Sequence, residues 1–222
     1  MVSNINGAAK SADDINLTSQ DIRRHLAGTK LSKSPTDVAM PPGSSRWPEP
    51  MREQLSGHLK PAGVLVPVIE RGNELSILLT QRAAELKHHA GQVSFPGGRM
   101  EDHDENVVAT ALRETHEEIG IAPHDVSVVG YLRAMPTITG YAVTPVVGLI
   151  AGDTELLIDH SEVEYTFEVP LHFFLDAAND IRKMREFHGR EVPMIEFSWE
   201  GERIWGATAY IILEFRKILL NK

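Results

Sequence analysis

Two apolar runs separated by a short polar turn place the strongest constraint on the fold of this chain. Residues 63–69 and 75–80 consist largely of Val, Leu and Ile. Between them lies Arg71-Gly72-Asn73-Glu74, which carries the glycine and asparagine favoured in tight hairpin turns. The pattern therefore predicts an antiparallel β-hairpin over residues 63–80, and the regular part of the chain begins at Gly63.

The segments after this hairpin alternate irregularly between strands and a small number of helices. A polar, glycine-rich loop over residues 82–98 leads to a predicted helix over residues 104–119, which Gly120 stops. Because no regular strand–helix–strand alternation follows, we expect an α/β (α+β) fold in which helices cover a mixed β-sheet. Further strands are predicted at 126–133, 143–150, 165–169, 195–199 and 203–205, and a last helix at 207–220.

The first fifty residues have a different composition from the rest of the chain. They are rich in Ser, Ala, Asn, Asp and Pro. One short helix is predicted over residues 18–27, with Thr18 or Ser19 as its cap and Gly28 as its stop. We predict a flexible or loosely docked extension over residues 1–50 and a single domain over residues 51–222.

Composition excludes several classes of function. The formal net charge is −9, so a nucleic-acid partner is disfavoured because a basic surface supplies most of that affinity. Without cysteine the chain has no disulfides, thiolate metal ligands or thiol nucleophiles. No apolar stretch is long enough to span a bilayer, so we expect no membrane partner and a cytoplasmic setting. The oligomeric state is left open, with a homodimer as one candidate.

The predicted helix over residues 104–119 carries the most informative cluster of charges. Glu114, Glu117 and Glu118 are spaced so that all three carboxylates project from one side of the helix. Such a face can simply be solvated. However, carboxylate oxygens are the ligands that Mg²⁺ prefers, and a bound cation would remove their mutual repulsion. Gly97 and Gly98 precede the helix and allow close backbone approach, although glycines alone are equally consistent with an ordinary turn.

These residues together resemble the sequence box of the Nudix hydrolases. The family pattern is Gly, five residues, Glu, seven residues, and then Arg-Glu-U-x-Glu-Glu-x-Gly-U, where U is aliphatic. This chain has Gly98, an acidic residue at Asp104 or Glu105, and then the run Arg113 to Ile121. The interval from Gly98 to Arg113 is one residue longer than the pattern, which makes the acidic position ambiguous, and Thr115 replaces an aliphatic residue.

The resemblance implies a fold, a cofactor and residue roles. Nudix proteins have a mixed sheet sandwiched between helices, an α/β/α arrangement, and use Mg²⁺ or Mn²⁺. Glu114 and Glu118 would be the main metal ligands, with Glu117 joining them or acting in catalysis and the backbone of Gly98 completing the set. Arg113 would hold a glutamate in position through a charge-assisted hydrogen bond.

A second block resembles the coenzyme A pyrophosphatase branch of that family. The branch reads Leu-Leu-Thr-x-Arg-Ser/Ala, three residues, Arg, three residues, Gly, three residues, Phe-Pro-Gly-Gly. Here it begins at Leu78 and runs through Arg82, Lys87 and Gly91 to Gly98, with Lys87 as the one departure from the pattern. The resemblance extends from about residue 60 to the C-terminus.

Coenzyme A as substrate would need cations besides the metal, because it carries a diphosphate and a 3′-phosphate. Arg82 and Lys87 are the candidates for phosphate contacts, together with the backbone at Gly97. Hydrolysis of the diphosphate linkage would yield 4′-phosphopantetheine and adenosine 3′,5′-bisphosphate, with metal ions lowering the pKa of the attacking water.

The general base is left open among several acids and histidines. Glu162 matches an acidic position of the pyrophosphatase branch and is the first candidate, although it could equally face solvent. A box glutamate, His116 and His160 are the others.

Two other functions compete with a coenzyme A pyrophosphatase. One is a broader nucleoside-diphosphate pyrophosphatase acting on ADP-ribose or dinucleotides, whose members usually lack the Leu-Leu-Thr-x-Arg block. The other is a Nudix-fold binding module without catalysis, which typically lacks one or more of the box glutamates that persist here.

Overall fold

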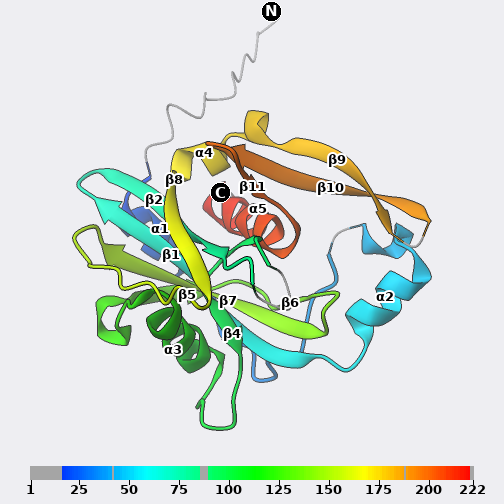
Figure 1. The fold of residues 1–222 in the computed structure, drawn as a ribbon, viewed down its shortest axis with the longest axis horizontal. Helices are drawn as coiled ribbons and strands as arrows, with labels where there is room; N and C mark the ends of the chain where they lie inside the picture. Colours follow the sequence, from blue (N-terminus) through cyan, green and yellow to red (C-terminus); the bar gives the residue numbers. More distant parts are fainter. Residues whose placement is uncertain (1–16, 42, 86–89, 188, 221–222) are drawn as a thin grey trace, which may run out of the picture.

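The computed structural model describes residues 17–41, 43–85, 90–187 and 189–220, and its centre is an eight-stranded mixed sheet (Figure 1). The main path through this sheet has the order β3-β2-β1-β7-β5, with β4, β6 and β8 pairing onto it. The strands are β1 (Lys60–Arg71), β2 (Glu74–Arg82), β3 (Val93–Ser94), β4 (Gly97–Arg99), β5 (Ser127–Tyr131), β6 (Met135–Pro136), β7 (Tyr141–Ala151) and β8 (Val163–Pro170).

The predicted hairpin is confirmed as the pair β1 and β2. Arg71 lies opposite Glu74, and the register continues to Val68 opposite Ile77. On its other edge β1 pairs in parallel with β7, from Lys60 opposite Tyr141 to Glu70 opposite Ala151. Since β1 and β7 are neighbours in the sheet, β3, β4 and the helix that carries Glu114, Glu117 and Glu118 (the carboxylate helix) all lie in the connection between them.

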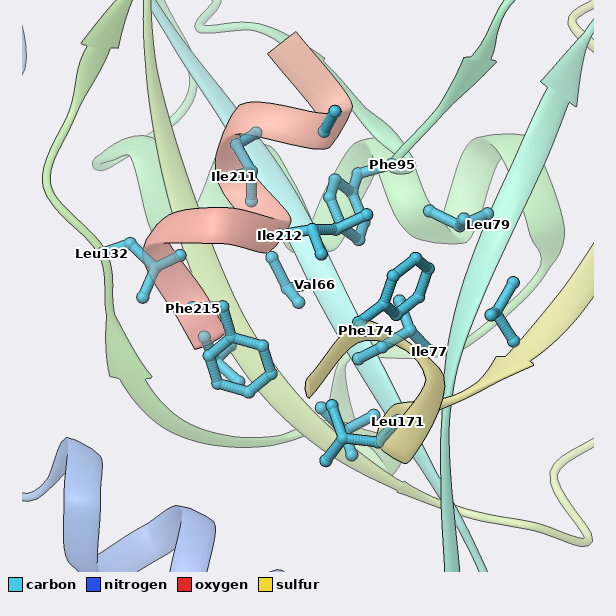
Figure 2. Packing of buried hydrophobic residues seen from close by; sticks show 14 of the residues in the cluster. Val66, Ile77, Leu79, Phe95, Leu132, Leu171, Phe174, Ile211, Ile212 and Phe215 are labelled. Atoms are coloured by element: carbon cyan, nitrogen blue, oxygen red, sulfur yellow. The ribbon is translucent and has the colours of Figure 1, made fainter. Parts of the chain in front are cut away.

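Helices cover both faces of the sheet, as Figure 1 shows, and a mixed sheet between helices is what the sequence predicted. Helix α3 (Val107–Ile119) packs on one face against β1 and β4. Helices α4 (Leu171–Leu175) and α5 (Gly206–Leu220) lie on the other. Figure 2 shows this second interface, where aliphatic side chains of β1 and β2 meet aromatic ones; its labelled residues include Val66, Ile77, Phe95, Phe174, Ile212 and Phe215.

Helix α3 begins later than the sequence pattern predicted. The predicted start was residue 104, whereas the helix starts at Val107. Asn106 is the cap, because its side chain accepts hydrogen bonds from the N–H groups of Val108 and Ala109 at 2.9 and 3.1 Å. Asp104 therefore lies before the helix, where its side chain is free to turn back toward later residues.

The predicted N-terminal helix is present as α1 (Ser19–Leu26), capped by Thr18. Its Ile22 and Leu26 are buried in the main core beside α5, and the helix packs on the edge strand β5. The backbone N–H of Tyr131 in that strand donates to Thr29 Oγ1 at 3.0 Å. This part of residues 1–50 is thus packed on the sheet, while the predicted domain boundary near residue 50 stays a prediction.

A second, three-stranded sheet stands apart from the first, in the order β11-β10-β9 (Figure 1). Its strands are β9 (Ile181–Phe187), β10 (Arg190–Trp199) and β11 (Glu202–Ile204), and helix α2 (Glu49–Ser56) packs against it through Met51 and Leu55. Of these strands, the sequence predicted the β10–β11 hairpin but not β9. Three 3₁₀ turns complete the described elements, at Ser44–Arg46, Pro123–Asp125 and Ala177–Asn179. No helix among the described residues is long and apolar enough to cross a membrane.

Candidate active site

Asp104 is the acidic residue that turns toward the carboxylate helix. Its side chain is buried and accepts hydrogen bonds from Nε and Nη2 of Arg113, both at 2.9 Å. Thr110 Oγ1 and the N–H of Glu101 also donate to it, at 3.0 and 2.9 Å. The hydrogen bonds from Arg113 hold the pKa of Asp104 well below its usual range. Glu105 is exposed, so the structure favours Asp104 as the acidic member of the box.

Arg113 joins Asp104 to two glutamates of α3. Its Nη2 lies 2.9 Å from Oε1 of Glu114, and its Nη1 lies 2.8 Å from Oε2 of Glu117. The guanidinium is therefore held on one side by a buried aspartate and presents its remaining donors to the carboxylates. Arg113 thus contacts both carboxylates, and its role in positioning them stays a prediction.

The three predicted carboxylates lie in different environments. The side chain of Glu118 is 2% exposed, that of Glu114 is 18% exposed and that of Glu117 is 54% exposed. Burial raises the pKa of Glu118 to about 7, and burial also raises the pKa of Glu114. Glu114 and Glu118 therefore form the inner part of the site, and Glu117 lies at its rim.

The two glycines of β4, Gly97 and Gly98, lie against the carboxylates of Glu118 and Glu114. The N–H of Gly97 donates to Oε2 of Glu118 at 3.1 Å. A side chain on Gly98 would have its Cβ 2.4 Å from Cδ of Glu114, so the carboxylate lies directly against this backbone. The close approach is possible because residue 98 lacks a side chain.

Arg82, at the end of β2, and Glu162, in the turn just before β8, approach the same carboxylates. Arg82 Nη1 lies 3.4 Å from Oε1 of Glu118. The charge of Glu162 contributes to the raised pKa values of both Glu114 and Glu118, so Glu162 lies within electrostatic reach of both carboxylates. The structure thus brings together Arg82, Gly97, Gly98, Arg113, Glu114, Glu118 and Glu162.

The other predicted residues lie elsewhere or outside the description. Lys87 falls outside the described residues. His116 and His160, the alternative bases, are both exposed, and Glu117 is paired with Arg113 at the rim.

Comparison with known proteins decides the family. The sequence model of the NUDIX domain family matches residues 59–199 of this chain, which is more than half of its length. The chain belongs to the Nudix family. It is 41% identical over 172 residues to the uncharacterized Nudix hydrolase NudL of Escherichia coli (strain SMS-3-5 / SECEC), covering 75% of this chain and 85% of that protein. The NudL protein of Escherichia fergusonii gives the same values.

A solved Nudix structure has a lower sequence identity to this chain. The MutT/nudix family protein from Enterococcus faecalis is 19% identical with a TM-score of 0.46, covering 73% of this chain and 63% of that one.

Nudix hydrolases generally use a divalent metal, and the inner carboxylates of this chain fit one. No three acidic or histidine side chains within the described ranges already gather at metal-binding distances. Even so, the charge of Glu162 helps to raise the pKa values of Glu114 and Glu118, and the charge of Glu114 helps to raise that of Glu118, so these carboxylates are near one another. A buried carboxylate with a raised pKa next to other carboxylates is a favourable place for a hard cation, which would neutralise the cluster.

Two features of this Nudix site were missed or left open by sequence reasoning. The choice between Asp104 and Glu105 could not be made from spacing, because the interval is one residue longer than the general pattern. The contact of Arg82 with Glu118 was not foreseen, although a signal exists. Leu78 and Arg82 lie four positions apart on one strand and so share a face, and Leu78 packs against Ala111 and Ile119 of α3.

Proposed function

We propose that this Nudix hydrolase cleaves the diphosphate linkage of coenzyme A or a derivative, with Mg²⁺ or Mn²⁺ as cofactor. The observation that carries the proposal concerns the block resembling the coenzyme A pyrophosphatases. Two members of this block contact the same carboxylate: Arg82 lies 3.4 Å from one oxygen of Glu118, and the N–H of Gly97 lies 3.1 Å from the other. The block therefore supplies part of the wall around a box carboxylate, which supports a role for it in the same reaction.

In this proposal Glu114 and Glu118 hold the metal, with the Gly98 backbone beside them. Bound metal supplies charge neutralisation for the diphosphate and lowers the pKa of the attacking water. Arg113 is a positioning residue, because it contacts Glu114 and Glu117 while Asp104 holds it from behind. Arg82 and Lys87 are proposed to bind phosphate oxygens of the substrate.

Glu162 is the proposed general base. It accepts a proton from a water molecule, whose oxygen forms a new bond to one phosphorus atom. The bond from that phosphorus to the bridging oxygen breaks, and the bridging oxygen leaves with the other phosphate. The products are 4′-phosphopantetheine and adenosine 3′,5′-bisphosphate. The position of Glu162, within electrostatic reach of both Glu114 and Glu118, supports this role.

The test is hydrolysis of coenzyme A, dephospho-coenzyme A, ADP-ribose and NADH, each with Mg²⁺ and with EDTA, followed by chromatography of the products. We expect metal-dependent cleavage with coenzyme A preferred over its dephospho form. A preference for ADP-ribose or NADH would replace coenzyme A by a broader nucleoside diphosphate as substrate. No cleavage of any of the four would contradict the proposed reaction.

A further inference from the structure

One carboxylate oxygen of Glu118 is paired with the guanidinium of Arg82. Oε2 accepts from the N–H of Gly97 at 3.1 Å, and Oε1 lies 3.4 Å from Nη1 of Arg82. The glutamate side chain is 2% exposed, whereas that of Arg82 is 24% exposed. Arg82 therefore reaches from a partly open position to a carboxylate that solvent barely touches.

The strand geometry holds Arg82 in this place. It ends β2, on the face whose earlier member Leu78 packs against Ala111 and Ile119 of α3. On β8 the register shifts at this point, so that Arg82 lies opposite Val163 whereas its neighbour Gln81 lies opposite Tyr165. The extra residue in β8 is a β-bulge, and Val163 is fully buried beside the same helix. Packing on both strands thus points the Arg82 side chain toward α3.

We propose that Arg82 couples metal binding to phosphate binding at this site. The inference rests on the proposed function, in which Glu118 is a metal ligand. A guanidinium and a divalent cation that use the same buried carboxylate repel each other, and little solvent is present to screen them. Arg82 therefore weakens metal binding when no anion is bound.

A substrate phosphate reverses this effect. By accepting hydrogen bonds from Arg82, the phosphate adds negative charge next to the guanidinium and offsets its repulsion of the metal. The two ligands then bind cooperatively, and because coupling is reciprocal, the metal strengthens phosphate binding by the same factor. The exposed part of Arg82 leaves room for this second contact.

The experiment measures Mn²⁺ affinity directly, by electron paramagnetic resonance of the free ion, with and without adenosine 3′,5′-bisphosphate. The variants are Arg82→Gln, which removes the charge, and Arg82→Lys, which keeps it. Arg71→Gln is the matched control, because Arg71, the last residue of β1, pairs with Glu168 of β8 and its loss changes the net charge equally.

We expect Arg82→Gln to bind Mn²⁺ about tenfold more tightly than the wild type, within the usual range of coupling energies. The bisphosphate should tighten Mn²⁺ binding in the wild type, in Arg82→Lys and in Arg71→Gln, and leave Arg82→Gln unchanged. Equal or weaker Mn²⁺ binding by Arg82→Gln would overturn the coupling.

A further variant separates this inference from the proposed function. If Glu118→Gln keeps wild-type Mn²⁺ affinity, the metal assignment is wrong and the coupling falls with it. If the coupling appears in the wild type and is lost in Arg82→Gln, but coenzyme A is not hydrolysed, the inference stands and only the substrate of the proposed function is wrong.

Discussion

Asp104, in the loop before α3, accepts two hydrogen bonds from Arg113 within the helix, each 2.9 Å long. The pair decides how the guanidinium meets the carboxylates of α3. Because Arg113 lowers the pKa of Asp104, the pair also makes the stability of the domain depend on pH.

Replacing Asp104 by Asn should lower both activity and the free energy of unfolding, the latter by about 2–4 kcal/mol, because a buried charge-assisted pair loses one partner. The pKa of Asp104 is lower in the folded protein than the value of about 3.9 in an unfolded chain. The stabilisation is therefore complete above about pH 4 to 5 and is lost as the pH falls toward the lowered value. Urea denaturation between pH 3 and pH 8 measures it.

The exposed neighbour provides the control for this change. Glu105→Gln should leave stability and activity near the wild-type values, since its side chain lies at the surface. Equal effects of the two substitutions would show that the Asp104–Arg113 pair has no special role.

Glu118→Gln should abolish most of the activity and yet stabilise the protein in EDTA at pH 8. Burial raises the pKa of Glu118 to about 7, above the value of about 4.3 in an unfolded chain. In the wild type, stability is therefore highest below about pH 4 and falls as the pH rises toward 7, by about 4 kcal/mol in all. The glutamine variant lacks this fall. A lower melting temperature for Glu118→Gln at pH 8 in EDTA would contradict the assignment.

The two glycines of β4 should respond differently to alanine. In Gly98→Ala the new Cβ would lie 2.4 Å from Cδ of Glu114, the far end of a flexible side chain. The fold should persist while turnover falls by about tenfold or more, since a displaced carboxylate misaligns the site. In Gly97→Ala the Cβ would lie 2.4 Å from the carbonyl oxygen of Gly63, with φ at +145°. That clash is with backbone, so the melting temperature should fall too. Unchanged turnover in Gly98→Ala would show that the position of Glu114 does not matter for the reaction.

Glu162→Gln should reduce turnover by about 100-fold to 10,000-fold, the usual contribution of a general base. The neighbouring Glu164 is exposed and is the extra residue where the β8 register shifts, so Glu164→Gln is the matched control. Turnover that survives in Glu162→Gln but is lost in His160→Gln would transfer the role to the histidine.

Ile22→Ala should lower the free energy of unfolding by about 2–4 kcal/mol, because the side chain is fully buried in the main core. Arg24→Ala on the same helix is the control, with a side chain that is 70% exposed. Equal stability of the two variants, measured by urea denaturation, would mean that α1 contributes little to the domain.

Sequence patterns predicted the local elements well where the signal lies in neighbouring residues. The turn at Gly72 fixes the β1–β2 hairpin, and the left-handed Gly120 ends α3, whereas the cap at Asn106, which begins the helix, was not foreseen. Strand β9 was missed because its exposed charged residues hide the strand alternation; it is held by pairing with β10, which no local pattern reveals.

The site was predictable in its residue types but not in its contacts. Spacing along α3 placed Glu114 and Glu118 on one side, yet their different burial depends on Gly97, Gly98 and Arg82, which come from other strands. The role of Asp104 depends on the path of the loop before α3.

The parallel pairing of β1 with β7 has a consequence for how the chain folds. The centre of the sheet joins Lys60 to Tyr141 and Glu70 to Ala151, segments that are far apart in the sequence. The long loop between them must close before this pairing gives any stabilisation, and topologies of this kind fold slowly. During synthesis, β1 and the whole of α3 are made before β7. The site can therefore become rigid only after a later part of the chain has arrived.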